Sequence, residues 1–181
     1  MVSINDTLFA MTEWLRTTPL VEAAIWISNR PASNWIGTHF WAIPIFQTLH
    51  ILAIAAAFGS VLMINLRILG LAGGTRTMTQ TVRRYLPWVW WALIVLIATG
   101  IGMIVGEPVR ELVNPYFWIK MGLLVVMILL SIGFQATVGR HTARWELRHD
   151  GRLVVRVGAV GIILLWFAIM ACGRWIAYAP V

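Results

Sequence analysis

Charged side chains are scarce in this chain. Asp, Glu, Lys and Arg make up 12% of the residues, whereas hydrophobic residues make up 60%. An ordinary soluble domain has about 25% charged residues, so this composition excludes that class of protein. The sequence instead predicts an integral protein that crosses a lipid bilayer several times.

Cysteine and deeply placed carboxylates are also missing. The single cysteine, Cys172, excludes an internal disulfide framework and any CxxC metal site. The long apolar stretches contain no Asp or Glu, which argues against an ion-coupled transporter, because such proteins usually place a carboxylate at depth. The sequence contains no Ser/His/Asp arrangement, phosphate-binding glycine loop or zinc-protease motif, so we do not expect an ordinary hydrolytic enzyme.

Four apolar stretches are each long enough to cross the hydrocarbon core, for which about 20 residues suffice. The pattern of charged residues places them at 31–66, 85–106, 116–139 and 154–173. In the first stretch we expect a helix that starts near Trp35 and is kinked or tilted at Pro44. Lys120 lies near the start of the third, where its ammonium can reach the interface. The predicted fold is all-α, with a four-helix transmembrane bundle over residues 35–181.

Residues 1–34 are expected to form a separate segment ahead of this bundle. Apolar side chains recur there at helical spacing, as at Leu8, Met11 and Leu15. A helix of this kind, with a tryptophan such as Trp14 beside its apolar face, is typical of segments that lie in the plane of the membrane interface. The sequence thus predicts an N-terminal interfacial amphipathic helical segment.

Most of the positive charge falls in two segments between predicted spans. Segments 67–84 and 140–156 contain Arg67, Arg76, Arg83, Arg84, Arg140, Arg144, Arg148, Arg152 and Arg156. Cationic loops stay in the cytoplasm, so we expect a multi-pass protein of the bacterial inner (cytoplasmic) membrane with both termini in the periplasm. These arginines account for the formal net charge of +7 and suit anionic lipid headgroups. We do not expect nucleic-acid binding.

Two histidines lie within the first predicted span. His50 is at the middle of this uncharged stretch, and His39 precedes it by about three helical turns. On one continuous helix the two rings would share a face, roughly 16 Å apart along the axis. An imidazole in hydrocarbon is costly to desolvate and marks a functional site by default. Because neutral imidazole is a common axial ligand of haem iron, His50 and His39 are candidate metal ligands.

Candidate partners for such a ligand are few. His141 belongs to the cytoplasmic edge, on the order of 15 Å from His50 along the membrane normal, so one subunit cannot readily clamp one iron between them. A two-fold homodimer could bring identical histidines together, Met103 and Met170 could supply thioether sulfur, or the iron could stay five-coordinate. Trp166 lies deeper in the fourth span, where it could pack against a porphyrin or fill the bundle.

A structural role is the alternative for His50. Small residues follow it, among them Ala53, Ala57 and Gly59, and small residues let another helix or a flat macrocycle approach closely. The imidazole could then hydrogen-bond a polar group of a neighbouring helix. Candidate members of such a pair are Gln47, Thr48, Gln135 and Thr137. The residues alone leave both interpretations open.

Several motifs together resemble a family of small, uncharacterised four-span proteins of the bacterial inner membrane. They are TPL at 18–20, FQTLHILAIAAAFGSVLMINLRILGL at 46–71, RYLPW, ATGIGM, and NPYFWIKMGLL at 114–124. The resemblance implies that His50 is the family's intramembrane histidine and that Arg67 closes the same helix, but it implies no activity. The pattern is also loosely similar to membrane b-type cytochromes. This chain lacks the paired histidines on a second helix that they show, and His39 is outside the family pattern.

We therefore expect an electron-transfer protein, similar to b-type cytochromes, that binds haem b through intramembrane histidines. It would be an electron carrier with a redox partner rather than a stand-alone enzyme, embedded in the bilayer as a homodimer or larger homo-oligomer. The alternative is a non-catalytic membrane scaffold or complex subunit in which His50 serves helix packing. A third hypothesis is copper handling through His39 with Met103 and Met170.

Overall fold

The computed structural model describes the backbone of residues 4–72, 77–145 and 149–178, and the side chains of residues 6–72, 77–131, 133, 153 and 155–178. These residues are mostly helical and contain no strand, so the all-α prediction is confirmed. The helices are α1 (Ile4–Arg16), α2 (Leu20–Ser28), α3 (Pro31–Thr38), α4 (Ala42–Leu69), α5 (Met78–Gly106), α6 (Pro108–Leu112), α7 (Pro115–Trp145) and α8 (His149–Trp175).

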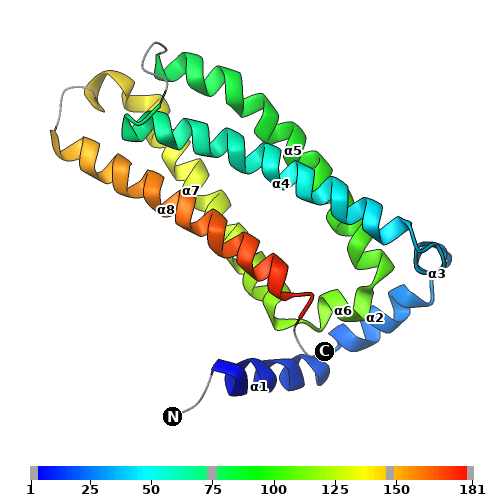
Figure 1. Cartoon of the computed structure of the whole chain (residues 1–181). Helices are drawn as coiled ribbons and strands as arrows, with labels where there is room; N and C mark the ends of the chain where they lie inside the picture. The colour runs from blue at the N-terminus through cyan, green and yellow to red at the C-terminus, as the bar shows by residue number, and fades with distance from the viewer. Residues whose placement is uncertain (1–3, 73–76, 146–148, 179–181) are drawn as a thin grey trace.

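Four long helices, α4, α5, α7 and α8, run side by side along the length of the molecule (Figure 1). Helix α4 contacts both α5 and α8, and α8 contacts α7. In the described part of the chain, the Cα atoms of α5 and α7 do not come within 8 Å of each other. The order of neighbours is therefore α5, α4, α8 and α7, with α4 and α8 at the centre.

Three of these helices are long and apolar enough to cross a membrane. They are α4, α5 and the part of α8 from Val155 to Trp175. The described apolar part of α7, Pro115–Ser131, is shorter, although the backbone of α7 continues to Trp145. The three helices are compatible with the expected membrane-embedded protein, and a fourth crossing stays a prediction.

The prediction of one continuous helix through the first apolar stretch is wrong. Helix α3 ends at Thr38, His39 has an extended backbone with φ −100° and ψ 97°, and α4 begins at Ala42. Pro44 consequently lies in the first turn of α4, where the N–H that proline lacks would have no intrahelical partner. A proline at this position permits the helix to start there and does not kink it. The helix ends at Gly70, whose φ of 78° is left-handed.

Helices α4 and α5 form the most extensive helix pair. A Cβ atom on Gly102 of α5 would come 2.9 Å from the ring of Phe46 on α4, so the absence of a side chain there lets the helices approach. The long helices share one apolar core. Its buried residues are Ala57, Ala92, Met127, Ile162, Trp166 and Ile169.

The short helices gather at one end of the long ones. Figure 1 shows α1, α2, α3 and α6 near the end of the molecule where α4 begins and α8 ends. Helix α1 contacts α2 and α7, and α2 contacts α6. The start of α7 is tied to the end of α8, because Asn114 Nδ2 donates to the Ile176 carbonyl at 3.0 Å.

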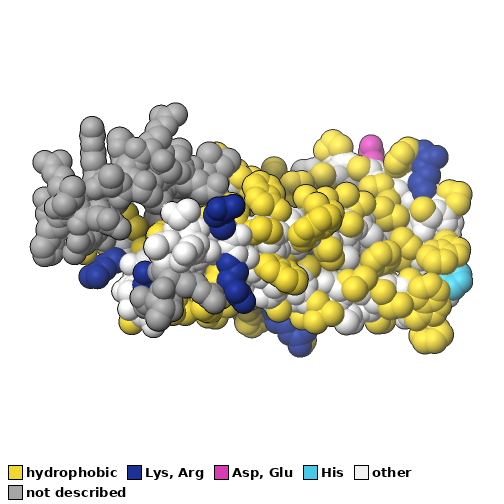
Figure 2. Space-filling view, turned by 90° about the horizontal axis from the view of Figure 1, so that it is seen from above, with side chains coloured by type: hydrophobic (Ala, Val, Ile, Leu, Met, Phe, Trp, Pro, Cys, Tyr) yellow, Lys and Arg dark blue, Asp and Glu magenta, His cyan; other side chains and the backbone are white. Residues whose placement is uncertain are grey.

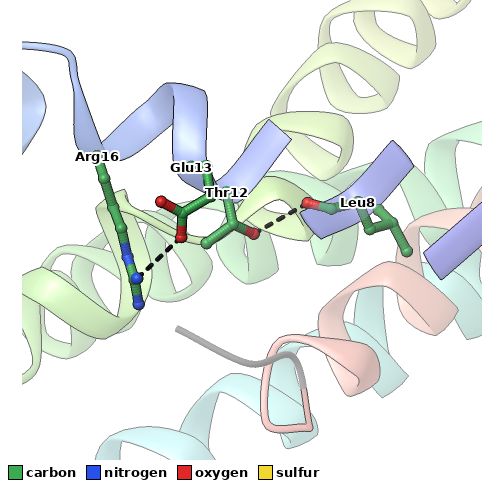
Figure 3. Close-up of polar contacts among 4 residues, drawn as sticks. All are labelled: Leu8, Thr12, Glu13 and Arg16. Carbon is green, nitrogen blue, oxygen red and sulfur yellow. Dashed lines mark hydrogen bonds and ion pairs between the residues drawn. The ribbon is translucent and has the colours of Figure 1, made fainter. Parts of the chain in front are cut away.

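Helix α1 has the two unlike faces that its sequence predicts. Thr12 and Leu15 are buried, and the Thr12 hydroxyl donates to the Leu8 carbonyl at 3.0 Å. Glu13 and Arg16 are exposed and form an ion pair with an N···O distance of 3.0 Å (Figure 3). Its place in the membrane interface and the division of the chain after residue 34 stay predictions, and α3 runs across that position.

The surface of the molecule is largely apolar. Figure 2 shows hydrophobic side chains over much of the visible face, with several Lys and Arg side chains near one end. On α5, Trp90, Trp91 and Ile94 are 58%, 68% and 58% exposed. An apolar surface of this extent is rare on a soluble monomer, and it is the surface that lipid tails or another membrane helix would cover.

Candidate functional site at His50

His50 lies in the third turn of α4 and faces α5. Its Nδ1 atom is 2.8 Å from Thr99 Oγ1. The Thr99 hydroxyl has one proton, which it donates to the Val95 carbonyl at 2.6 Å. The hydroxyl oxygen therefore accepts a hydrogen bond from His50 Nδ1–H, and this bond fixes the tautomer of the imidazole.

This tautomer leaves a lone pair on His50 Nε2. Within the described part of the chain we find no hydrogen bond to Nε2, and the imidazole is half-buried rather than fully enclosed. A histidine that ligates a metal usually shows the same arrangement, in which one ring N–H donates to an oxygen and the other nitrogen binds the metal. Of the two ring nitrogens of His50, Nδ1 is thus the one with a hydrogen bond among the described residues.

Small residues and a buried hydroxyl create this environment. A Cβ atom on Gly100 would lie 3.8 Å from His50 Cε1, so the glycine leaves room beside the ring. Thr99 is 5% exposed, and its bond to the carbonyl four residues earlier satisfies the hydroxyl proton inside an apolar helix. His50 therefore has the expected hydrogen bond to a polar group of a neighbouring helix, and the partner is Thr99.

Thr99 was not among the partners that the sequence suggested for His50. Thr48 donates instead to the Pro44 carbonyl at 2.8 Å, and the side chains of Gln135 and Thr137 lie outside the described residues. The signal that could have found Thr99 is the motif ATGIGM. It places one hydroxyl between small residues in the C-terminal half of an apolar span.

Lys120 of α7 is a second polar group at this site, for which the sequence predicted only a position near the interface. Its Cδ atom lies 3.8 Å from the place of a Cβ on Gly173 of α8, so the side chain passes along the α7–α8 contact. The positive charge of Lys120 acts on His50, Glu111 and Cys172. Groups of α4, α6 and α8 therefore interact electrostatically with one ammonium.

Glu111 of the short helix α6 is the carboxylate of this group. Burial raises the pKa of the Glu111 carboxyl above its usual range, while the charges of Lys120 and Arg110 act in the opposite direction and that of Glu107 adds to the rise. Arg110 itself forms an ion pair with Glu107 at 2.5 Å. Glu111 is thus the less compensated of the two acids.

His39 does not share a helix with His50, because the chain breaks between α3 and α4. Its Nδ1 atom is 2.6 Å from the Trp35 carbonyl. Its ring centroid lies 4.5 Å from that of Trp35 and 5.6 Å from that of Trp41. The prediction that the two rings lie on one face of one helix is wrong, since the spacing implies that face only for a continuous helix.

The expected thioether ligands occupy different helices. Met103 follows Thr99 by one turn on the same face of α5, about 6 Å along the axis. Met170 lies on α8, one turn after Trp166. Trp166 is 7% exposed and its ring centroid lies 5.9 Å from that of Phe58, so in this structure it fills the core between α8 and α4.

The side chain of His141 lies outside the described residues, but its place on α7 is clear from the backbone. Helical rise separates it from Lys120 by about 32 Å along the axis. Because Lys120 lies near His50, His141 and His50 of one chain are too far apart to bind the same iron. The sequence also predicted that one subunit cannot bind one iron through both of these histidines.

The donor set limits what the site can hold. Among the described residues we find no group of three or more His, Cys, Asp or Glu side chains placed to bind a metal ion. Haem needs fewer donors from the protein, because the porphyrin supplies four nitrogens and the protein supplies the axial ligands. His50 would supply one such ligand, and the described residues place no second histidine beside it.

A hollow on α4 does not belong to this site. An apolar groove of about 380 Å³ is lined by Phe40, Trp41, Pro44, Ile45, Thr48 and Leu49. Helical periodicity places these residues of α4 on the face opposite His50. A group bound to His50 Nε2 would therefore lie elsewhere.

Comparison with known proteins gives one match. The model of the Family of unknown function (DUF6644) matches residues 32–179, which includes the helices that carry His50, Thr99 and Lys120. No curated protein and no solved structure matches the chain. The match extends over most of the sequence, and the chain therefore belongs to the family of unknown function DUF6644.

Proposed function

We propose that the protein is a b-type cytochrome-like electron carrier in which His50 is an axial ligand of haem b. The observation that supports this most is the hydrogen bond from His50 Nδ1–H to Thr99, because it orients the ring and leaves Nε2 available. An imidazole within an apolar helix is otherwise costly to retain. Haem b, when bound, supplies a one-electron couple at its iron.

The chemistry of the donors favours haem over copper. A bare copper ion needs several protein ligands, and no such group is found among the described residues. His39, Met103 and Met170 lie on different elements, so the expected copper set is not assembled within the described chain. One histidine is enough for haem, because the remaining equatorial donors belong to the porphyrin.

We propose further that pairing of subunits completes the coordination. The described residues of one chain bring no second histidine to His50, and a two-fold axis would bring the same residue of a second copy. Met103, one turn from Thr99 on the same face of α5, is a candidate donor among the described residues. The exposed apolar face of α5 supports a homo-oligomer in the membrane.

The proposal includes four membrane crossings, with α7 as the fourth, in the bacterial inner membrane. Arg83 and Arg84 lie in the second turn of α5, and Arg156 lies in the first part of α8. Their helix ends lie opposite the short N-terminal helices (Figure 1). The positive-inside rule makes the arginine-bearing end cytoplasmic and both termini periplasmic. A redox partner could then approach from either side.

The hydrogen bond between His50 and Thr99 also favours the second candidate function. It connects α4 to α5, the most extensive helix pair, and a bond of this kind is worth about 0.6 kcal/mol on average between membrane helices. In a non-catalytic scaffold or complex subunit, this contribution to packing would be the whole role of His50. The two functions differ in whether Nε2 carries iron.

The test is the visible absorbance of protein purified from membranes, measured for wild type, His50→Ala and His39→Ala. We expect a Soret band in wild type and in His39→Ala, and its loss in His50→Ala with an unchanged elution volume on size exclusion. A colourless wild-type protein that elutes as a stable oligomer would instead support the scaffold. Metal analysis of the same samples tests copper.

A further inference from the structure

The apolar groove on α4 lies on the face of the helix opposite His50. Its volume is about 380 Å³, and the residues that line it recur along α4 at intervals of three and four. The groove therefore follows one face of the helix. Ile45 and Leu49 within it are exposed, and α4 is apolar and long enough to cross a membrane. In a bilayer the groove would open toward lipid.

The length of the groove is close to that of one lipid leaflet. Residues 41–49, which span it, rise by about 12 Å along the helix axis. Half of the hydrocarbon core of a bilayer is about 15 Å thick. Because the groove starts where α4 starts, it runs from the membrane interface toward the bilayer centre. An acyl chain of the leaflet in which α4 begins would lie along it.

Three aromatic rings gather at the mouth of the groove. The ring centroid of His39 lies 4.5 Å from that of Trp35 and 5.6 Å from that of Trp41, and the two tryptophan rings are 5.7 Å apart. Trp41 also lines the groove, and both tryptophans are exposed. Tryptophan is typical of the membrane interface, where lipid headgroups lie. A lipid chain in the groove would therefore place its headgroup beside these rings.

The imidazole of His39 offers a hydrogen-bond acceptor at this position. Its Nδ1 atom lies 2.6 Å from the Trp35 carbonyl oxygen, and a carbonyl can only accept, so Nδ1 carries the proton. In the neutral ring Nε2 then has a lone pair. Within the described residues we find no hydrogen bond to His39 Nε2, and the ring is partly exposed. A headgroup that binds here must supply an N–H or O–H donor.

The charges of the surrounding segment favour one class of headgroup. Residues 31–66 include no Asp, Glu, Lys or Arg, and Arg30 just before them lies over the ring of Trp26, 3.7 Å from its centroid. A headgroup with a net negative charge would therefore lack a cation within this segment. Aromatic faces instead attract a cation, and a primary ammonium can also donate to an imidazole nitrogen.

We propose that the groove on α4 holds an acyl chain of phosphatidylethanolamine, whose ammonium donates a hydrogen bond to His39 Nε2. This lipid has a primary ammonium and no net charge, as the aromatic and uncharged surroundings require. Trp35 and Trp41 lie beside the ammonium, and Ile45 and Leu49 contact the chain. The site is on the face of α4 opposite His50, so it does not depend on the proposed haem.

The experiment is native mass spectrometry of the full-length protein in detergent, titrated with three phospholipids that have the same acyl chains. Phosphatidylethanolamine is compared with phosphatidylcholine, which is cationic at the same place but has no N–H, and with anionic phosphatidylglycerol. The variants are His39→Phe and Thr48→Phe. Ile51→Phe is the matched control, because Ile51 is an exposed residue of α4 outside the groove.

Wild type should bind phosphatidylethanolamine about tenfold more tightly than the other two lipids, which is the effect of one hydrogen bond to a charged group. His39→Phe should remove this preference. It keeps a ring beside Trp35 and Trp41 and leaves the Thr38 hydroxyl 3.1 Å from the Trp35 carbonyl. Thr48→Phe fills the groove and should weaken binding of all three lipids, whereas Ile51→Phe should change neither affinity nor preference.

Wild-type protein alone can overturn the headgroup assignment, so the test does not require that every variant folds. Equal binding of phosphatidylethanolamine and phosphatidylcholine, or tighter binding of phosphatidylglycerol, contradicts the bond to His39 Nε2. Unchanged lipid binding in Thr48→Phe contradicts the groove as the site. If Thr48→Phe instead converts a dimer to a monomer without a change in lipid binding, a second copy of the chain covers the groove and the proposal is wrong.

Discussion

Replacement of Thr99 by valine tests how the protein holds the imidazole of His50. Valine has nearly the same shape as threonine but lacks the hydroxyl, so the change leaves His50 Nδ1–H without its 2.8 Å partner. Because the side chain of Thr99 is buried, water cannot readily replace the lost acceptor. An unsatisfied buried donor costs about 1–3 kcal/mol, and measured bonds between membrane helices lie at or below the lower part of that range. We expect a loss of about 1 kcal/mol in stability.

The larger effect should fall on the ligand. Loss of the bond that orients a metal-binding histidine costs about 10- to 100-fold in affinity, and the freed ring can also adopt the other tautomer. Thr99→Val should therefore release haem about 10- to 100-fold faster in an apomyoglobin transfer assay. A shifted reduced α-band should accompany the faster release.

Thr81→Val is the control for this substitution. Thr81 is also a buried threonine on α5, and its hydroxyl also donates to the carbonyl four residues earlier, that of Thr77 at 3.1 Å. It has no contact with His50, so the control should retain haem at the wild-type rate. Equal haem retention in Thr99→Val, Thr81→Val and wild type would refute the role given to the His50–Thr99 bond.

Three further predictions concern packing and charge. Gly102→Ala places a Cβ 2.9 Å from the ring of Phe46 and should destabilise the protein by about 1–3 kcal/mol in detergent unfolding. Gly59 has open space around it, so Gly59→Ala should not destabilise the protein. Equal effects of the two substitutions would contradict the close α4–α5 contact. Trp166→Ala removes a core ring and should cost about 3 kcal/mol in the same assay, and a neutral result would argue against its place in the core. Burial raises the pKa of the Glu111 carboxyl, so the ionised carboxylate destabilises the folded protein as the pH rises. Glu111→Gln should therefore raise the thermal midpoint of unfolding at pH 7 but not near pH 4.

Much of the architecture could be predicted from apolar runs and arginine positions. These patterns placed the C-terminal ends of α5 and α8 within two residues, because a helix that crosses a membrane needs a long apolar run with charges at its ends. The break at His39 could not be predicted in this way. Residues 31–66 carry no charge, and nothing in hydropathy distinguishes a turn at Thr38 from a continuing helix.

The site was predictable only in part, for the same reason. His50 stood out as an imidazole at mid-span, but its partner Thr99 lies on another helix, and the sequence alone does not give the register between α4 and α5. The sequence predicted only that Lys120 reaches the membrane interface, and it assigned no role to Glu111. Their approach to the site follows from the fold of α6 between α5 and α7, which a local pattern does not encode.

The most direct test of whether His50 Nε2 binds iron is the visible spectrum of the purified wild-type protein, recorded before and after addition of dithionite. We predict a Soret band in the oxidised protein and a sharpened α-band after reduction, as expected of a haem b protein. A colourless protein with no change on reduction would contradict the electron-carrier proposal and leave the hydrogen bond to Thr99 as a packing contact.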